Sequence, residues 1–208
     1  MASHAPCRSP RFIYSEVFDG FAADLTPGQV NALRRNGSVR GVEVDRVATV
    51  VPLGKPTKPG GGGSTEPTPQ PDPVDGTQEL PADGSLWGLD RIDAAGLDQL
   101  YSYATTGTGT GVTAYVVDTG ISTAHPDFGG RATLAFDNAG GKPARGGDCN
   151  GHGTHVAGTI GGTTHGVAKR VQLRSVRVLD CNGSGAYSGV IAGLDHVLKN
   201  HPGPRWST

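Results

Sequence analysis

Two polar side chains in this sequence are spaced to form a proton-transfer pair. His152 has glycine on both sides, at Gly151 and Gly153, and opens a run of small residues. Asp118 directly follows the apolar and β-branched run at 112–117. A hydrolytic serine needs a histidine to accept its proton, and that histidine needs a buried carboxylate to hold its tautomer. An aspartate followed by a histidine begins the order Asp, His, Ser, one of the known chain orders for such triads.

A strand and a helix must bring these two side chains together. The run at 112–117 is typical of a strand covered on both faces of a parallel sheet. Asp118 would lie at its carboxyl end, where open α/β sheets place their functional crevice. The small residues at 153–158 let a helix that begins at His152 pack closely on the sheet. An aspartate after a strand is also a common turn residue, and His155 lies one turn after His152, so residue types alone leave both assignments open.

A second strand and another helix follow in the same pattern. Residues 171–179 predict a second strand of the parallel type, and a glycine-rich loop then runs from Asp180 to Tyr187. Apolar residues recur after this loop at helical spacing, which predicts a helix that packs on the sheet. This stripe consists of Val190, Ile191, Leu194, Val197 and Leu198. Residues 85–208 are therefore interpreted as an α/β domain.

The N-terminal residues 12–50 predict a small, incomplete α+β module. Residues 12–25 favour two short strands joined by a turn. Thr26 can cap a helix and Gln29 completes a capping box, with proline at the first helical position. The alternating valines at 39–44 predict a further strand after the helix. Two or three strands with one helix bury little apolar surface, so this module would fold poorly alone.

Residues 51–84 predict a disordered linker between these two parts. The segment is rich in proline, glycine, threonine and acidic residues, with unbroken glycine at 60–63. Such a composition cannot bury enough apolar surface to offset the entropy of ordering the chain.

The net charge and the distribution of apolar residues argue against several classes of protein. A net charge of -1 gives no reason to expect binding to nucleic acid or to an anionic membrane surface. No apolar run approaches the roughly 18 residues of a membrane span. The first ten residues lack an apolar core, so no secretory signal is visible.

The motifs around the aspartate and the histidine resemble those of the subtilases, the subtilisin-like serine proteases, in their proteinase K and aqualysin branch. Residues 112–120 and 150–159 match that branch almost letter for letter. The resemblance implies a partial doubly wound parallel sheet of the subtilisin type. It also implies that Asp118 and His152 are the catalytic acid and base, while His155 is structural.

The same resemblance implies a substrate site and a partner for it. In subtilases the loop after the second strand forms one edge of the substrate cleft, and the peptide adds to it as a strand. The residues at that edge would be Ser184, Gly185, Ala186 and Tyr187. Residues 20–23 and 42–45 resemble the C-terminal half of a subtilase propeptide, an intramolecular chaperone and inhibitor. Residues 12–50 would then be a partial propeptide module.

Cys149 and Cys181 have two interpretations. The resemblance implies a disulfide between them, which would close a loop of about 32 residues and contribute roughly 3 to 4 kcal/mol. Such a bond would indicate an oxidising, extracytoplasmic compartment. Together with His152 and His155 the two cysteines also have the ligand chemistry of zinc, although their spacing fits none of the usual structural zinc sites.

Asp90 and Asp93 match acidic positions that help to bind calcium in some relatives. Calcium takes six to eight oxygen ligands, and the following positions, Ala94 and Leu100, offer no side-chain oxygen. We expect no cofactor in the chemistry itself. Asp90 and Asp93 have two interpretations, as ligands of a stabilising calcium ion or as part of a solvated helix start.

The family pattern stops after Asn200. In subtilases, three functional features follow this point. They are the substrate-binding segment, the oxyanion-hole asparagine and the sequence motif that carries the nucleophilic serine. We therefore expect a secreted, monomeric serine endopeptidase, present here as a fragment with little activity of its own. Its partners would be a peptide or protein substrate and its own propeptide. The alternatives are a protease-inhibiting module at residues 12–50 and a zinc-binding hydrolase.

Overall fold

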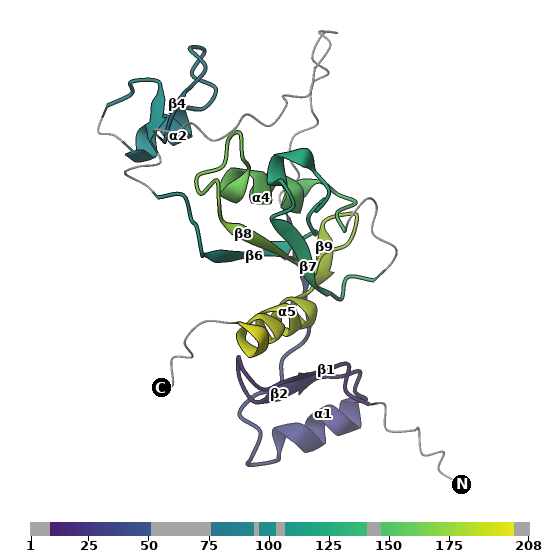
Figure 1. Ribbon diagram of the computed structural model, residues 1–208. Helices are drawn as coiled ribbons and strands as arrows, with labels where there is room; N and C mark the ends of the chain where they lie inside the picture. The colour runs from purple at the N-terminus through teal and green to yellow at the C-terminus, as the bar shows by residue number, and fades with distance from the viewer. Residues whose placement is uncertain (1–8, 51–75, 94–95, 103–106, 141–146, 202–208) are drawn as a thin grey trace.

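A three-stranded parallel sheet forms the centre of the molecule (Figure 1). The computed structural model describes five segments of the chain, which are residues 9–50, 76–93, 96–102, 107–140 and 147–201. In the sheet, β8 (Gln172–Arg177) lies between β6 (Thr113–Asp118) and β7 (Ala132–Asp137), and both pairs are parallel. The predicted α/β class with a parallel sheet is confirmed, although the sequence pattern did not reveal β7.

Two helices cover opposite faces of this sheet (Figure 1). Helix α4 (His152–Gly161) packs through Ala157 on a cluster that includes Val116 and Leu173. Helix α5 (Tyr187–Asn200) packs on a second cluster. Its members include Val176, Val178, Val190 and Val197. Successive residues of a strand point to opposite faces, so one apolar strand supplies both clusters.

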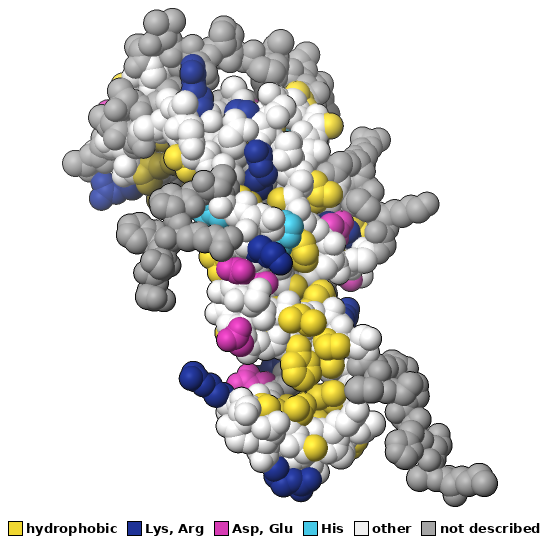
Figure 2. Space-filling model, turned by 60° about the horizontal axis from the view of Figure 1, so that its bottom comes forward, with side chains coloured by type: hydrophobic (Ala, Val, Ile, Leu, Met, Phe, Trp, Pro, Cys, Tyr) yellow, Lys and Arg dark blue, Asp and Glu magenta, His cyan; other side chains and the backbone are white. Residues whose placement is uncertain are grey.

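Helix α5 buries less of its apolar stripe than the sequence predicts. Val190 and Val197 pack against the sheet, but Leu194 is 41% exposed and Leu198 is 46% exposed. The three strands cover only one side of the helix, because a helix resting on a sheet buries one stripe of its surface. Figure 2 shows apolar side chains gathered over the lower half of the molecule.

The N-terminal module (residues 12–50) contains a two-stranded antiparallel sheet and one helix. Strands β1 (Phe12–Tyr14) and β2 (Gly20–Ala22) pair with each other, and helix α1 (Pro27–Arg34) follows them. The predicted capping box is confirmed, since the Thr26 side chain accepts the Gln29 backbone N–H and the Gln29 side chain accepts that of Thr26.

The strand predicted at residues 39–44 is wrong. That segment has no strand, and Val44 is 81% exposed. The strand lies further on, at β3 (Val47–Thr49), which pairs antiparallel with β9 (Ser184–Ala186). Alternating valines favour an extended backbone, but the strand forms where an edge is available to pair with it.

A small satellite unit precedes the sheet. Strands β4 (Thr77–Glu79) and β5 (Leu100–Ser102) pair antiparallel beside helix α2 (Trp87–Asp93). Its core consists of Leu80, Leu89 and Tyr101.

The prediction of a disordered linker at 51–84 is therefore wrong for the end of that range. Residues 77–79 pair with β5, and Leu80 is buried against Tyr101. Residues 51–75 lie outside the described part of the chain. No helix in the described segments has the length and apolarity needed to cross a bilayer.

Candidate active site

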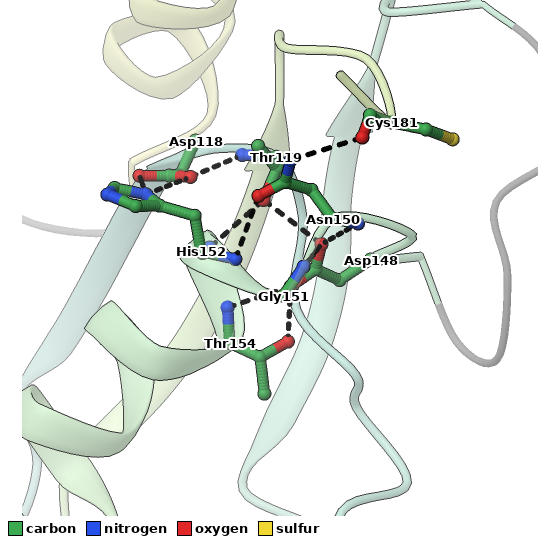
Figure 3. Close-up of polar contacts among 9 residues, drawn as sticks. Asp118, Thr119, Asp148, Asn150, Gly151, His152, Thr154 and Cys181 are labelled. Carbon is green, nitrogen blue, oxygen red and sulfur yellow. Dashed lines mark hydrogen bonds and ion pairs between the residues drawn. The ribbon is translucent and has the colours of Figure 1, made fainter. Parts of the chain in front are cut away.

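The structure brings Asp118 and His152 into direct contact (Figure 3). The Nδ1 atom of His152 lies 2.8 Å from Oδ1 of Asp118 and 2.9 Å from its Oδ2. Asp118 is buried at 8% exposure, and His152 is only partly exposed. An ionised carboxylate only accepts hydrogen bonds, so Nδ1 carries the proton and Nε2 is the basic nitrogen. The arrangement can take up a proton at Nε2 and stabilise the resulting imidazolium.

Asp118 is held in place by the end of the sheet. Its carboxylate accepts the backbone N–H of Thr119 at 2.6 Å. Its backbone carbonyl accepts the N–H groups of Val178 and Leu179, just after β8. These bonds hold the carboxyl end of β6 beside its neighbour strand, which places the carboxylate at the crevice edge of the sheet.

Asp148 holds the start of the helix that carries His152 (Figure 3). The N-cap of the helix is a glycine, Gly151, which has a φ of 100° and offers no side-chain cap. Asp148 supplies the missing acceptor, taking N–H groups from Asn150, Gly151 and Thr154. It also accepts the hydroxyl groups of Thr119 and Thr154. The N–H groups of Gly151 and Thr154 thus bind Asp148, while that of His152 binds the Asn150 side chain and that of Gly153 binds the Thr119 hydroxyl.

The environment of Asp148 favours its charged form. Burial by itself would raise its pKa, but the hydroxyl of Thr154 and the N–H groups of Gly151, Thr154 and Asn150 outweigh that cost and lower the pKa below its usual value. Thr119 links this carboxylate to the helix, because its hydroxyl oxygen accepts the N–H of Gly153.

Sequence reasoning missed both Asp148 and Thr119. An aspartate just before a helix start is a common capping residue, and that signal at Asp148 could have been noticed. Nothing in the local sequence around Thr119 indicates that its hydroxyl would reach the helix.

Close packing between the helix and the sheet explains two of the glycines. A side chain at Gly153 would overlap the carbonyl oxygen of Gly120 and lie 3.1 Å from Cβ of Asp118. Gly120 has a φ of 113°, and a side chain there would overlap the carbonyl of Gly147. At Gly158, by contrast, a Cβ would meet no described atom within 4 Å.

Cys149 and Cys181 form a disulfide, as predicted, with their Cα atoms 4.9 Å apart. The bond joins the loop before His152 to the loop before β9. The zinc alternative needs Cys149 and Cys181 as thiolate ligands. Because the two cysteines form a disulfide, they cannot bind a metal as thiolates. His155 is exposed, and the described segments contain no group of three or more metal-ligating side chains.

The predicted cleft edge carries a strand from the same chain. Ala186 pairs with Val47 and Ser184 pairs with Thr49 across the antiparallel β3–β9 pair. Tyr187 is 52% exposed, and its N–H donates to the Arg46 carbonyl. The edge is thus able to accept an extended peptide, which is the property predicted for Ser184, Gly185, Ala186 and Tyr187. Their role toward a substrate stays a prediction.

The calcium prediction at Asp90 and Asp93 stays a prediction. Both carboxylate oxygens of Asp90 accept backbone N–H groups, from Asp98 and Gln99. Asp93 uses Oδ2 for the N–H of Ser102, and its Oδ1 is buried without a partner in the described structure. Calcium takes six to eight oxygen ligands, and these two carboxylates would supply only some of them.

Comparisons with known proteins agree with this geometry. The family model described as "Subtilase family" matches residues 109–202. Alkaline serine exoprotease A of Vibrio alginolyticus is 43% identical over 192 residues, which are 92% of this chain and 32% of the relative. The extracellular serine proteinase of Thermus sp. (strain Rt41A) is 60% identical over 122 residues, which are 58% of this chain and 29% of the relative.

The fold of this chain also matches that of a solved structure. It is the crystal structure of a cold adapted subtilisin-like serine proteinase, at 52% identity and a TM-score of 0.50. The match covers 57% of this chain and 43% of that structure. The chain thus spans about a third of the length of the two relatives described above.

Proposed function

We propose that the chain is part of a secreted subtilisin-like serine endopeptidase that cleaves peptide bonds, since residues 109–202 match the subtilase family model. The observation that carries this proposal is the contact of His152 Nδ1 with the buried Asp118 carboxylate at 2.8 Å. It supplies two of the three groups that acyl transfer by a serine requires.

His152 acts first as a base and then as an acid. Its Nε2 accepts the proton of the attacking serine hydroxyl and passes a proton to the leaving amine. Asp118 holds the ring and stabilises the imidazolium without itself becoming protonated. No cofactor takes part in these steps. Secretion is in keeping with the disulfide and with the relative whose name describes it as extracellular.

We propose that none of the serines in these 208 residues is the nucleophile, because none has the sequence context that the family motif gives it. Among the described residues no side chain hydrogen-bonds to Nε2 of His152, and the hydroxyl of Ser188 is bound to Asp45 at 2.6 Å. Ser175 is fully buried within β8. We therefore propose that this chain alone has little or no activity, because loss of the nucleophile removes most of the catalysis.

A second function is favoured by the β3–β9 pair. The N-terminal module places an extended segment of its own along the edge where a substrate peptide would add, and the Val50 N–H continues this pairing to the Gly183 carbonyl. A strand held in this way competes with substrate, so we propose that the module is a propeptide that inhibits the site.

A chimera tests the leading proposal. In the Thermus proteinase, the aligned segment is replaced by its counterpart from this chain, and hydrolysis of a peptide anilide is measured. We expect the chimera to be active and the 208-residue chain to show no turnover above buffer. In the chimera, His152→Ala should lower kcat by about 10⁶-fold and Asp118→Asn by about 10⁴-fold.

His155→Ala is the matched control, since His155 lies on the same helix and is exposed. It should leave kcat within a few-fold of the parent chimera. Equal losses from the two histidine variants, or clear turnover by the 208-residue chain, would contradict the proposal.

A further inference from the structure

The two sulfurs of the disulfide lie in different surroundings. Cys181 is exposed, whereas Cys149 is partly buried. Cys149 lies beside the guanidinium of Arg177, whose Nη2 is 3.7 Å from Sγ of Cys149. Which sulfur an external thiol attacks depends on access, and which sulfur leaves depends on how well its thiolate is stabilised.

Arg177 is an unusual neighbour, because its side chain is wholly buried. Its Nη1 donates to the Asp137 carboxylate at 3.0 Å and to the Gly140 carbonyl at 3.3 Å. Its Nε has no partner in the described structure. A guanidinium remains charged in proteins. The hydrogen bonds of Arg177 therefore leave Nη2 directed at the sulfur of Cys149.

The other charges nearby do not distinguish the two cysteines in the same way. Asp148 precedes Cys149 and Asp180 precedes Cys181, so each sulfur has one carboxylate as its neighbour in sequence. Both carboxylates are bound to backbone N–H groups of their own loops. Asp137 balances part of the charge of Arg177. The contact with Arg177 remains as the difference, and it favours a thiolate at Cys149.

We propose that Cys181 is a site of S-thiolation by small external thiols. The thiolate of the external molecule attacks Sγ of Cys181 and forms a new disulfide bond with it. The Cys149–Cys181 bond breaks, and its electron pair leaves on Sγ of Cys149 as a thiolate that Arg177 stabilises. The external thiol is the only co-reactant, and the reverse attack by Cys149 restores the original bond.

This modification would release a covalent link beside the candidate active site. The disulfide joins the loop that positions His152 to the loop that leads into β9. The hydrogen bonds of Asp148 do not involve either sulfur, so we expect His152 to keep its place. The strand edge at β9 would lose its covalent attachment to that loop, although the Asn150 side chain still donates to the Cys181 carbonyl.

Peptide mapping tests the proposal on the full chain with Cys7→Ser, which removes the third cysteine. The folded protein is exposed to excess glutathione at pH 7, quenched in acid, and analysed by mass spectrometry. We expect the glutathione adduct on Cys181 to exceed that on Cys149 by about tenfold or more. Equal adducts, or an excess on Cys149, would overturn the proposal.

Substitution of Arg177 tests whether its charge, or only the greater exposure of Cys181, explains the preferred site of the adduct. Arg177→Lys should keep the preference for Cys181, and Arg177→Gln should reduce it severalfold. Should the Gln variant fail to fold, single-thiol variants provide the same comparison. The thiol of Cys149 in Cys181→Ser should then have a lower pKa than that of Cys181 in Cys149→Ser, and equal or reversed values would reject the role of Arg177.

Discussion

The geometry of His152 depends on a carboxylate that does not touch it. Asp148 receives three backbone N–H groups and two hydroxyl groups around the helix start. A buried charge is tolerated only when its hydrogen bonds replace water, and those of Asp148 do so. At this scale the N-cap glycine, Gly151, offers no side-chain cap, and the side chains of Asp148, Asn150 and Thr119 accept the N–H groups at the helix start.

Asp148→Asn should therefore destabilise the fold by about 2 to 3 kcal/mol at neutral pH, because an amide cannot replace all the accepted bonds. The pKa of Asp148 is lowered in the folded chain, so its contribution is fully present above the unfolded value of about 4. That contribution is lost as the pH falls through the folded pKa. Urea unfolding from pH 7 to pH 2 should show the wild type and the variant converging.

Asp83→Asn is the control for this measurement. Asp83 is exposed, accepts the N–H of Ser85, and also has a lowered pKa because of that backbone bond. Its substitution should change the free energy of unfolding little. If the Asp148 variant loses the same free energy of unfolding at every pH, the shape of the side chain rather than its charge explains the effect.

At the scale of elements, α4 and β6 approach each other through glycine. The contact at Gly153 allows the helix start to lie against Gly120, which directly follows the Asp118–Thr119 pair. Any side chain there must push the helix away from the strand end, because the atom in its way belongs to the backbone. The distance between His152 and Asp118 is thus set by the absence of a Cβ.

Gly153→Ala should destabilise the chain by about 2 kcal/mol or more, since overpacked sites cost this much. Gly158→Ala on the same helix is the matched control, because open space surrounds it. Alanine is the better helix former by up to about 1 kcal/mol, so that variant should be as stable as the parent or more stable. Thermal unfolding compares them, and equal shifts of Tm in the two variants would argue against close packing at Gly153.

At the scale of the whole molecule, α5 is a docking element for the N-terminal module. The carboxylate of Asp195 accepts the N–H groups of Ser15, Glu16 and Val17 at 2.7 to 3.1 Å. Tyr14 donates its hydroxyl to the Ser188 carbonyl. The module in turn caps α5, which has no side-chain cap of its own, because Asp45 accepts the N–H and the hydroxyl of Ser188. Together with the β3–β9 pair, these bonds attach the module at both ends of its chain.

Asp195→Ala should release the β1 end of the module. Loss of the charged acceptor should weaken docking by about 2 kcal/mol, and Asp195→Asn should have a smaller effect because its carbonyl can still accept. Hydrogen exchange at residues 15–17 measures this directly. In an active chimera that carries the module, the same variant should relieve inhibition. Unchanged exchange and unchanged inhibition would contradict the proposed role of this contact.

Patterns that depend on near neighbours were predicted correctly from sequence. The capping box at Thr26 and Gln29 needs only residues within one turn, and the structure contains it. The strand that ends at Asp118 and the helix that begins at His152 also follow from local composition. The motif resemblance then paired Asp118 with His152. Local composition alone could not do so, because His155 fits the same pattern of a histidine near a helix start.

Most contacts between distant segments were beyond the sequence, although the motif resemblance supplied the Asp118–His152 pair and the Cys149–Cys181 disulfide. The strand predicted at 39–44 lies instead at Val47–Thr49, because the edge of β9 is available there. Leu80 is buried because β5 and α2 meet it, and two leucines of α5 stay exposed because the sheet covers one side of that helix. The hydrogen bonds of Asp148 and the arginine beside Cys149 likewise depend on partners from other elements.

The sequence by itself thus determined the class of fold, and the motif resemblance added the pairing of Asp118 with His152. Only the tertiary structure decided which groups hold Asp118 and His152 in place, and that β3 occupies the edge of β9. Burial and hydrogen-bond partners come from segments that lie far apart in the chain.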